Sequence, residues 1–412
     1  MTQTQARLIT PVLIASSIIL ILSFGIRAGF GLFQIPVAEE FGWMRAEFSM
    51  AIAIQNLAWG IGQPIFSAIA EKFGDRKAIV LGVICYAFGL AMTAFAITPG
   101  QMQLLEVFVG FGISGTAFGI LLAVVGRATA EEHRSMALGI VTAMGSVGQV
   151  VGPPVIAALL AVMAWQSVFL VLAAATLLIL LILPFMKAPS QVNKAEMNES
   201  MSEILGRAFR DPSYALIFVG FFSCGYQLGF ITAHFPAFVA EVCGPISPGG
   251  VLDSLGVSTT TALGAWAIAL IGLTNIAGTI YAGKLGATLP KKYLLSGIYA
   301  LRTVIAAAFI IVPMTPATVI VFSAAMGALW LATVPLTSGL IAHIYGLRYM
   351  GTLYGIVFLS HQLGSFMGVW LGGELYDLHG SYNLVWWVGV AVGAFSAIVH
   401  LPVREERKEA FA

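Results

Sequence analysis

The sequence predicts an all-α integral membrane protein whose twelve transmembrane helices form two pseudo-symmetric six-helix bundles. Hydrophobic residues make up 59% of the chain and charged residues only 9%, with a mean hydropathy of +0.93, whereas a soluble globule carries about 25% charged residues. Twelve apolar segments are long enough to cross a bilayer, which takes about 20 residues each. Glycine patterns of the first half also recur in the second half.

The repeat has two parts, which fall in different apolar segments. One group of glycines recurs 216 positions later and another recurs 200 positions later. Duplicated halves around a central site are how many secondary transporters are built. The matching positions are Gly139, Gly148 and Gly152 with Gly355, Gly364 and Gly368, and then Gly25 and Gly29 with Gly225 and Gly229.

The twelve predicted spans divide evenly between two halves, 1–186 and 213–412. A polar stretch, 187–212, separates them and reads as a cytoplasmic linker with a short amphipathic helix at 199–210. We predict spans at 11–36, 46–70, 77–98, 101–126, 136–160, 165–186, 213–240, 262–286, 292–313, 315–343, 350–376 and 382–402.

Orientation follows from the bias of Lys and Arg toward cytoplasmic loops. Placing both termini in the cytoplasm puts nearly all loop Lys and Arg residues inside and leaves an excess of acids outside. The first apolar run is too long for a signal-peptide core and is interpreted as a retained span. The expected location is therefore the cell's inner membrane, with the chain as a multi-pass monomer in the lipid bilayer.

Several function classes find no support in the sequence. The net charge of +1 and the lack of a basic arm give no sign of a nucleic-acid partner. No His, Cys or acidic cluster has metal-ligand spacing, and no phosphate-cradling loop is present. We therefore expect no metal, no cofactor and no enzymatic activity. The cysteines are interpreted as buried small hydrophobes; they are Cys85, Cys224 and Cys243.

The loop after the second span reads Gly74-Asp75-Arg76-Lys77. Acids and bases between two helix ends can pair across neighbouring helices and bind end carbonyls. In this position the loop resembles that of the major facilitator superfamily, whose members share a twelve-helix, two-bundle fold. The resemblance implies that Gly74, Asp75 and Arg76 form a gating latch on the inner side.

The fifth span carries Gly145, Gly148, Gly152 and Pro153. Small residues at this spacing let helices approach closely, and proline bends a helix, so we interpret the group as helix packing. The pattern also resembles the glycine-proline motif of drug/proton antiporters in the same superfamily. This resemblance keeps export by proton antiport open as an alternative.

Arg27 lies past the middle of the first span, where a charge is costly unless it faces protein or water. Its fork of donors fits a carboxylate in two-point contact. Its surroundings resemble the monocarboxylate and oxalate/formate porter branch, in which a lysine of this span contacts the substrate carboxylate. Arg27 is thus predicted to bind an anionic substrate; the alternative is a cation neutralised by a neighbouring acid.

Three polar residues in other spans are further candidates. The porter branch places a basic residue on span 11, so His361 is predicted to contact substrate or carry a proton, against an interhelical histidine. Asn275 stands where animal monocarboxylate carriers place an acid, and it either binds substrate or joins helices. Glu106 enters span 4 and is predicted to carry a proton or neutralise Arg27, unless it is simply solvated.

Further polar side chains at the depth of the centre can complete the site. Gln227 is the counterpart of Arg27 in the 200-residue repeat. The others are Tyr226, Gln34 and Tyr354, with packing as the alternative for each. Arg302, near the centre of span 9, is assigned either an interhelical or a cavity role.

These observations predict a secondary active transporter of small organic anions, monocarboxylates in particular. Transport would proceed by alternating access, either as symport with protons or as anion exchange. The rival hypothesis is a drug or metabolite exporter of the proton-antiport type.

Overall fold

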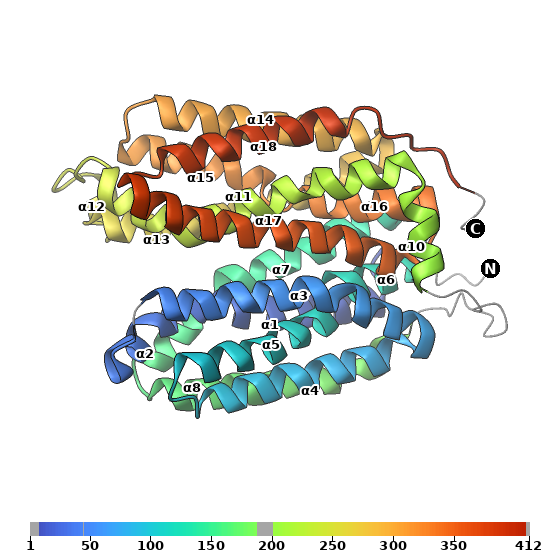
Figure 1. The fold of residues 1–412 in the computed structure, drawn as a ribbon, viewed down its shortest axis with the longest axis horizontal. Coiled ribbons are helices and arrows are strands. Elements are labelled where there is room, and N and C mark those ends of the chain that lie inside the picture. The colour runs from blue at the N-terminus through green and yellow to red at the C-terminus, as the bar shows by residue number, and fades with distance from the viewer. Residues whose placement is uncertain (1–7, 44, 188–200, 409–412) are drawn as a thin grey trace.

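The computed structural model describes residues 8–43, 45–187 and 201–408, and over that part of the chain its regular structure is entirely helical. Helices of the first half and of the second half form two groups that lie side by side (Figure 1). The first half contains α1 (Pro11–Ala28), η2 (Phe30–Phe33), α2 (Gln34–Phe41), α3 (Arg45–Phe73), α4 (Asp75–Thr93), α5 (Pro99–Thr116), α6 (Phe118–Ala128), α7 (Glu131–Leu160), α8 (Trp165–Leu177), α9 (Ile179–Ile182) and η3 (Leu183–Phe185). The second half contains α10 (Met201–Phe209), α11 (Pro212–Val242), α12 (Val251–Ser254), α13 (Thr260–Thr288), α14 (Lys291–Ile311), α15 (Pro316–Leu329), α16 (Thr333–Tyr345), α17 (Met350–His379) and α18 (Asn383–Val399).

Each predicted span coincides with one helix or with consecutive helices, which confirms the predicted fold class. Spans 4 and 10, at corresponding places in the two halves, are each broken near the middle, into α5 with α6 and α15 with α16. Among the described residues, nine helical stretches are long and apolar enough to cross a membrane. The predicted amphipathic helix after the sixth span is α10, and 188–200 of the predicted linker lie outside the described residues.

Two helix starts show why the chain turns where it does. Thr98 and Thr315 precede α5 and α15, and each side chain accepts a hydrogen bond from the third residue of its helix. That residue bonds back to the threonine backbone, so both starts are capping boxes, followed at once by a proline. These local signals begin the corresponding spans of the two halves in the same way.

The two ends of the molecule are distinguished by the chain termini. We call the side where α1 begins and α18 ends the termini side, and the opposite side, where α2 and α12 lie, the far side (Figure 1). The sequence predicts that the termini side faces the cytoplasm.

Repeated glycines bring one pair of helices together in each half. A Cβ atom on Gly148 of α7 would lie 2.3 Å from the Ile21 carbonyl oxygen of α1. One on Gly152 would lie 2.1 Å from the Gly25 carbonyl oxygen, so only glycine fits at these two positions. Gly145 differs, because its nearest neighbour would be an ordinary 3.7 Å contact with Phe24. α7 then continues as a helix past its two prolines to Leu160.

The second half repeats this packing between α11 and α17. A Cβ atom on Gly364 or Gly368 would lie 2.1 Å or 2.3 Å from a carbonyl oxygen of α11. Conversely, Gly229 of α11 approaches the Ser365 carbonyl of α17. The two glycine repeats found in the sequence therefore meet in space, once in each bundle.

The bundles touch along two lines, α3 with α17 and α7 with α13. On the termini side, a Cβ atom on Gly139 would lie 3.0 Å from the Gly283 Cα atom, and one on Gly355 would lie 2.8 Å from the Pro64 Cα atom. α6 is buried from Phe118 to Gly126, and nearly all of α16 is buried as well. A helix buried all round has no face left for a solvent path, so the termini side of the interface is closed.

Candidate functional site

Arg27 lies in the last turn of α1, where it is half-buried. Its Nη2 atom donates a 2.8 Å hydrogen bond to the Asn56 side-chain oxygen, and its guanidinium lies 4.9 Å from the centre of the Trp59 ring. The Nε atom is buried without a partner. Within the described ranges, no carboxylate comes within ion-pair distance of this arginine. The charge is therefore held by a neutral amide and an aromatic face, an arrangement that leaves donors available to an anion.

A chain of polar groups links Arg27 to the other bundle. The Asn56 backbone carbonyl accepts a 3.0 Å hydrogen bond from the side-chain amide of Gln362 on α17. The Gln362 side-chain oxygen lies 2.9 Å from Nδ1 of His361, whose Nε2 atom is buried without a partner. We call these four residues, Arg27, Asn56, Gln362 and His361, the polar chain. It brings the two basic residues predicted to contact substrate, Arg27 and His361, into one network across the bundle interface.

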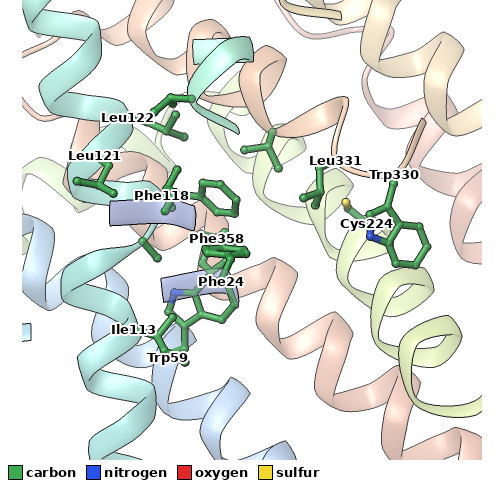
Figure 2. Packing of buried hydrophobic residues seen from close by; sticks show 14 of the residues in the cluster. Phe24, Trp59, Ile113, Phe118, Leu121, Leu122, Cys224, Trp330, Leu331 and Phe358 are labelled. Atoms are coloured by element: carbon green, nitrogen blue, oxygen red, sulfur yellow. The ribbon is translucent and has the colours of Figure 1, made fainter. Parts of the chain in front are cut away.

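An aromatic cluster lies about one helical turn from Arg27, toward the termini side. It consists of Phe24 and Trp59, with Phe118 of α6 and Phe358 of α17 (Figure 2). Ring centres are 4.8 Å apart for Phe24–Phe118 and 4.8 Å apart for Trp59–Phe358. The second contact crosses between the bundles. We call these four residues the aromatic floor, because they separate Arg27 from the closed termini side.

Glu106 of α5 is completely buried, with one carboxylate oxygen 2.6 Å from the side-chain amide nitrogen of Gln55 and the other without a partner. Burial corrects the alternative that this side chain is simply solvated. Gln55 and Asn56 are neighbours on α3, so Glu106 and Arg27 are connected through consecutive amides rather than by direct contact. In this conformation Glu106 does not neutralise Arg27.

Asn275 of α13 uses both ends of its amide on protein groups. Its nitrogen donates to the Ser146 hydroxyl of α7 at 2.6 Å, and its oxygen accepts from the Leu331 backbone N–H at 2.9 Å. Leu331 lies in the break between α15 and α16, where the helix leaves an amide free. In this conformation Asn275 links α13 to α7 and to the break between α15 and α16.

The remaining predicted contacts are dispersed. Tyr226 donates from its hydroxyl to the Val385 carbonyl, and Gln227 donates to the Gly389 carbonyl, so both face α18 inside the second bundle. Tyr354 of α17 is fully buried, with a hydroxyl that lacks a partner. Gln34 begins α2, and its side chain lies outside what the structure describes.

The predicted gating residues act within the first bundle. Gly74 has a φ of 101°, which favours glycine and turns the chain between α3 and α4. Asp75 pairs with Arg127 at the end of α6, at 2.6 Å. Arg76 donates to the carbonyls of Pro184 and Met186.

A hydrogen-bonded contact between the bundles comes from a residue that the sequence analysis missed. Near the end of α3, Glu71 accepts hydrogen bonds from the backbone N–H and the hydroxyl of Thr352, in the first turn of α17. Helix starts carry free N–H groups and a positive dipole end, which a carboxylate stabilises. The signal was an acid directly after the predicted end of span 2 and a threonine near the start of span 11, but sequence alone does not show that these ends meet.

Comparison with known proteins agrees with this architecture. The model of the major facilitator superfamily matches residues 16–245 and 237–412. An uncharacterized transporter of this type, YcxA of Bacillus subtilis, is 24% identical over 93% of this chain and 92% of its own length. Monocarboxylate transporter 13 of Rattus norvegicus is 23% identical over 91% of this chain and 83% of its own length.

Solved structures share the fold at lower sequence identity. The fucose:proton symporter of E. coli superposes with a TM-score of 0.69 at 14% identity, covering 95% of this chain and 97% of the symporter. Two family-model matches that together extend from residue 16 to residue 412 decide the assignment. This chain belongs to the major facilitator superfamily.

Proposed function

We propose that this protein is a secondary active transporter of small organic anions, monocarboxylates in particular, and that it works by alternating access. The observation that carries the proposal is the environment of Arg27. A permanently charged group sits half-buried at the bundle interface, with an amide and an aromatic ring in place of a carboxylate partner. A carboxylate ligand would supply the missing countercharge and occupy the free guanidinium donors.

The arrangement around Arg27 suits a cargo that enters from the far side. The aromatic floor and the buried α6 and α16 close the path toward the termini side. The polar chain connects the arginine to His361, so a bound anion can influence both bundles at once. Release on the termini side requires the bundles, 1–186 and 213–412, to separate where Glu71 and Thr352 now join them.

Coupling to protons has two candidate carriers. Glu106 is a buried carboxyl with one unpartnered oxygen, and His361 has one unpartnered ring nitrogen. His361 belongs to the polar chain, and Glu106 is hydrogen-bonded to Gln55, the neighbour of Asn56 on α3. Symport with a proton and exchange of anions are both consistent with this placement. The Lys and Arg bias supports cytoplasmic termini, and we further propose that the protein is a monomer in the inner membrane.

The proposal is tested by ligand binding to purified protein. Wild-type protein is titrated with acetate, lactate, pyruvate and oxalate, and with the uncharged amide of each, while the shift in melting temperature is recorded. A carboxylate should stabilise the fold and its amide should not. Arg27→Ala should weaken carboxylate binding roughly tenfold to hundredfold, since hydrogen bonds to charged groups contribute about 1.5–3 kcal/mol.

Two further variants sharpen the test. Arg27→Lys keeps the charge but loses the two-point fork, so it should bind between wild type and Arg27→Ala. Arg404→Ala removes an exposed arginine of the C-terminal segment and should bind as wild type does. Unchanged carboxylate binding in Arg27→Ala would refute the anion site. If cationic or neutral compounds bind equally well to wild type and to Arg27→Ala, the drug-exporter alternative would instead be favoured.

A further inference from the structure

A second deep arginine lies in the other bundle. Arg302 of α14 has no exposed surface, and its Nε and Nη2 atoms are buried without partners. Its guanidinium lies 5.9 Å from the Tyr299 ring centre. Across the described part of the chain, no Asp or Glu lies within ion-pair distance of it. A buried, uncompensated cation is strongly destabilising, so its countercharge must come from another kind of group.

Cys224 of α11 is the side chain to which Arg302 donates. The Nη1 atom lies 3.5 Å from the Cys224 sulfur, and the Thr333 hydroxyl of α16 lies 3.3 Å from the same sulfur. Cys224 is also completely buried, so water cannot take the place of these partners. Two hydrogen-bond groups from two other helices thus converge on one sulfur atom.

The groups around this sulfur are mostly donors. Arg302 and Tyr299 of α14, and Tyr354 and His361 of α17, interact electrostatically with Cys224. Both tyrosine hydroxyls and the His361 Nε2 atom are buried without partners. His400, just past α18, stacks on Tyr299 with ring centres 5.1 Å apart. Of these groups only the thiol and the two phenols can become negative, and a thiol ionises more readily than a phenol.

We propose that Cys224 is held as a thiolate and is the counter-ion of Arg302, forming a buried ion pair between α11 and α14 that can accept and release a proton. This proposal does not depend on the cargo. Protonation would leave the guanidinium without a countercharge in the membrane interior. Proton occupancy would therefore be coupled to how α11 and α14 pack. His361 lies beside this pair, since its carbonyl lies against Gly225, the residue after Cys224.

Infrared spectroscopy distinguishes a thiol from a thiolate, because only the thiol has an S–H stretching band. The sample is the full chain with Cys85→Ser and Cys243→Ser, so that Cys224 is the remaining cysteine. We expect no S–H band at neutral pH, and we expect the band to appear on acidification or in an Arg302→Met version. A matched chain that retains only Cys85 should show the band at neutral pH. An S–H band from Cys224 at neutral pH in the otherwise unchanged protein would overturn the proposal.

Stability measurements give an independent test. Cys224→Asp keeps a negative charge and Cys224→Asn does not, although the two side chains are nearly equal in size. We expect the Asp variant to melt at the higher temperature. Cys224→Ala combined with Arg302→Met should melt above Cys224→Ala alone, because both charges then disappear together. An Asn variant as stable as the Asp variant, or a double variant no better than Cys224→Ala, would contradict an ion pair.

Discussion

We assign the function of this protein to single ionisable side chains within the membrane-spanning helices, rather than to an extended pocket. Arg27 is separated from Glu106 by two neighbouring amides of α3, each of which binds one of the charged groups. A change of charge on either residue therefore alters the hydrogen bonding of the same short stretch of helix. This arrangement connects an anion on Arg27 with a proton on Glu106 without direct contact between them.

The residue-scale prediction concerns proton coupling at Glu106. Glu106→Gln keeps the size of the side chain and its contact with Gln55 but cannot release a proton. We expect accumulation of substrate driven by a pH gradient to be lost, while exchange of anions across the membrane is retained. The measurement is uptake into proteoliposomes with and without an imposed gradient. Glu39→Gln, a change at an exposed acid, is the control, and gradient-driven uptake that survives in Glu106→Gln would rule this role out.

At the scale of helices, the glycine repeats determine which pairs pack most closely. α1 meets α7 and α11 meets α17 through positions where a Cβ atom would come within about 2.5 Å of a backbone carbonyl. Backbone cannot move aside as the end of a side chain can. The same spacing in the two halves therefore gives two equivalent, rigid helix pairs, one in each bundle.

The element-scale prediction compares two glycines of α7. Gly152→Ala places a methyl group 2.1 Å from the Gly25 carbonyl oxygen and should destabilise the protein by about 1–3 kcal/mol through overpacking. Gly145→Ala is the matched control, since its Cβ would lie 3.7 Å from Phe24. Melting curves in detergent should show a clear loss for Gly152→Ala and little change for Gly145→Ala. Equal melting temperatures of the two variants would mean that α1 and α7 can move apart at little cost in free energy.

At the scale of the whole molecule, the bundles are joined on the termini side and through the middle of the interface. The contact of Glu71 with the start of α17 lies at the termini end of one line of contact, and the close approach of Gly139 to Gly283 lies on the other. Opening this side separates both lines. Because the Glu71 carboxylate would lose its two hydrogen bonds when this side opens, it favours the closed state.

The whole-molecule prediction is that Glu71→Ala shifts the protein toward opening on the termini side. Charge-assisted hydrogen bonds contribute about 1.5–3 kcal/mol, so the closed population should fall by roughly tenfold or more relative to the open one. Ala342 of α16 is 5% exposed in the closed state, and an Ala342→Cys probe should react faster with a water-soluble maleimide after the change. The background carries Cys85→Ser and Cys243→Ser.

Asp75→Asn is the control for this experiment. It breaks the pair with Arg127 inside the first bundle and leaves the contact between bundles in place. We expect a smaller change in labelling than Glu71→Ala gives. A probe that reacts equally fast in wild type and Glu71→Ala would show that this contact does not hold the gate.

The sequence by itself determined the membrane class, the order of the spans and the positions of the glycine repeats. These features are local, since hydropathy over about 20 residues and the spacing along one helix decide them. It also singled out Arg27, because a charge deep in an apolar span is unusual whatever its neighbours. The sequence did not identify the partner of Arg27, Asn56, because that pairing depends on which face of α3 packs against α1.

Only the tertiary structure decided the partners of the other polar residues. It placed Asp75 against Arg127, Glu71 against Thr352 and Cys224 against Arg302, in each case from helices far apart in the chain. It also gave Asn275 two protein partners in place of a free amide. The physical reason is that hydropathy fixes which segments enter the membrane, whereas the rotation of each helix about its axis is set by packing against neighbours. That rotation decides which polar groups meet.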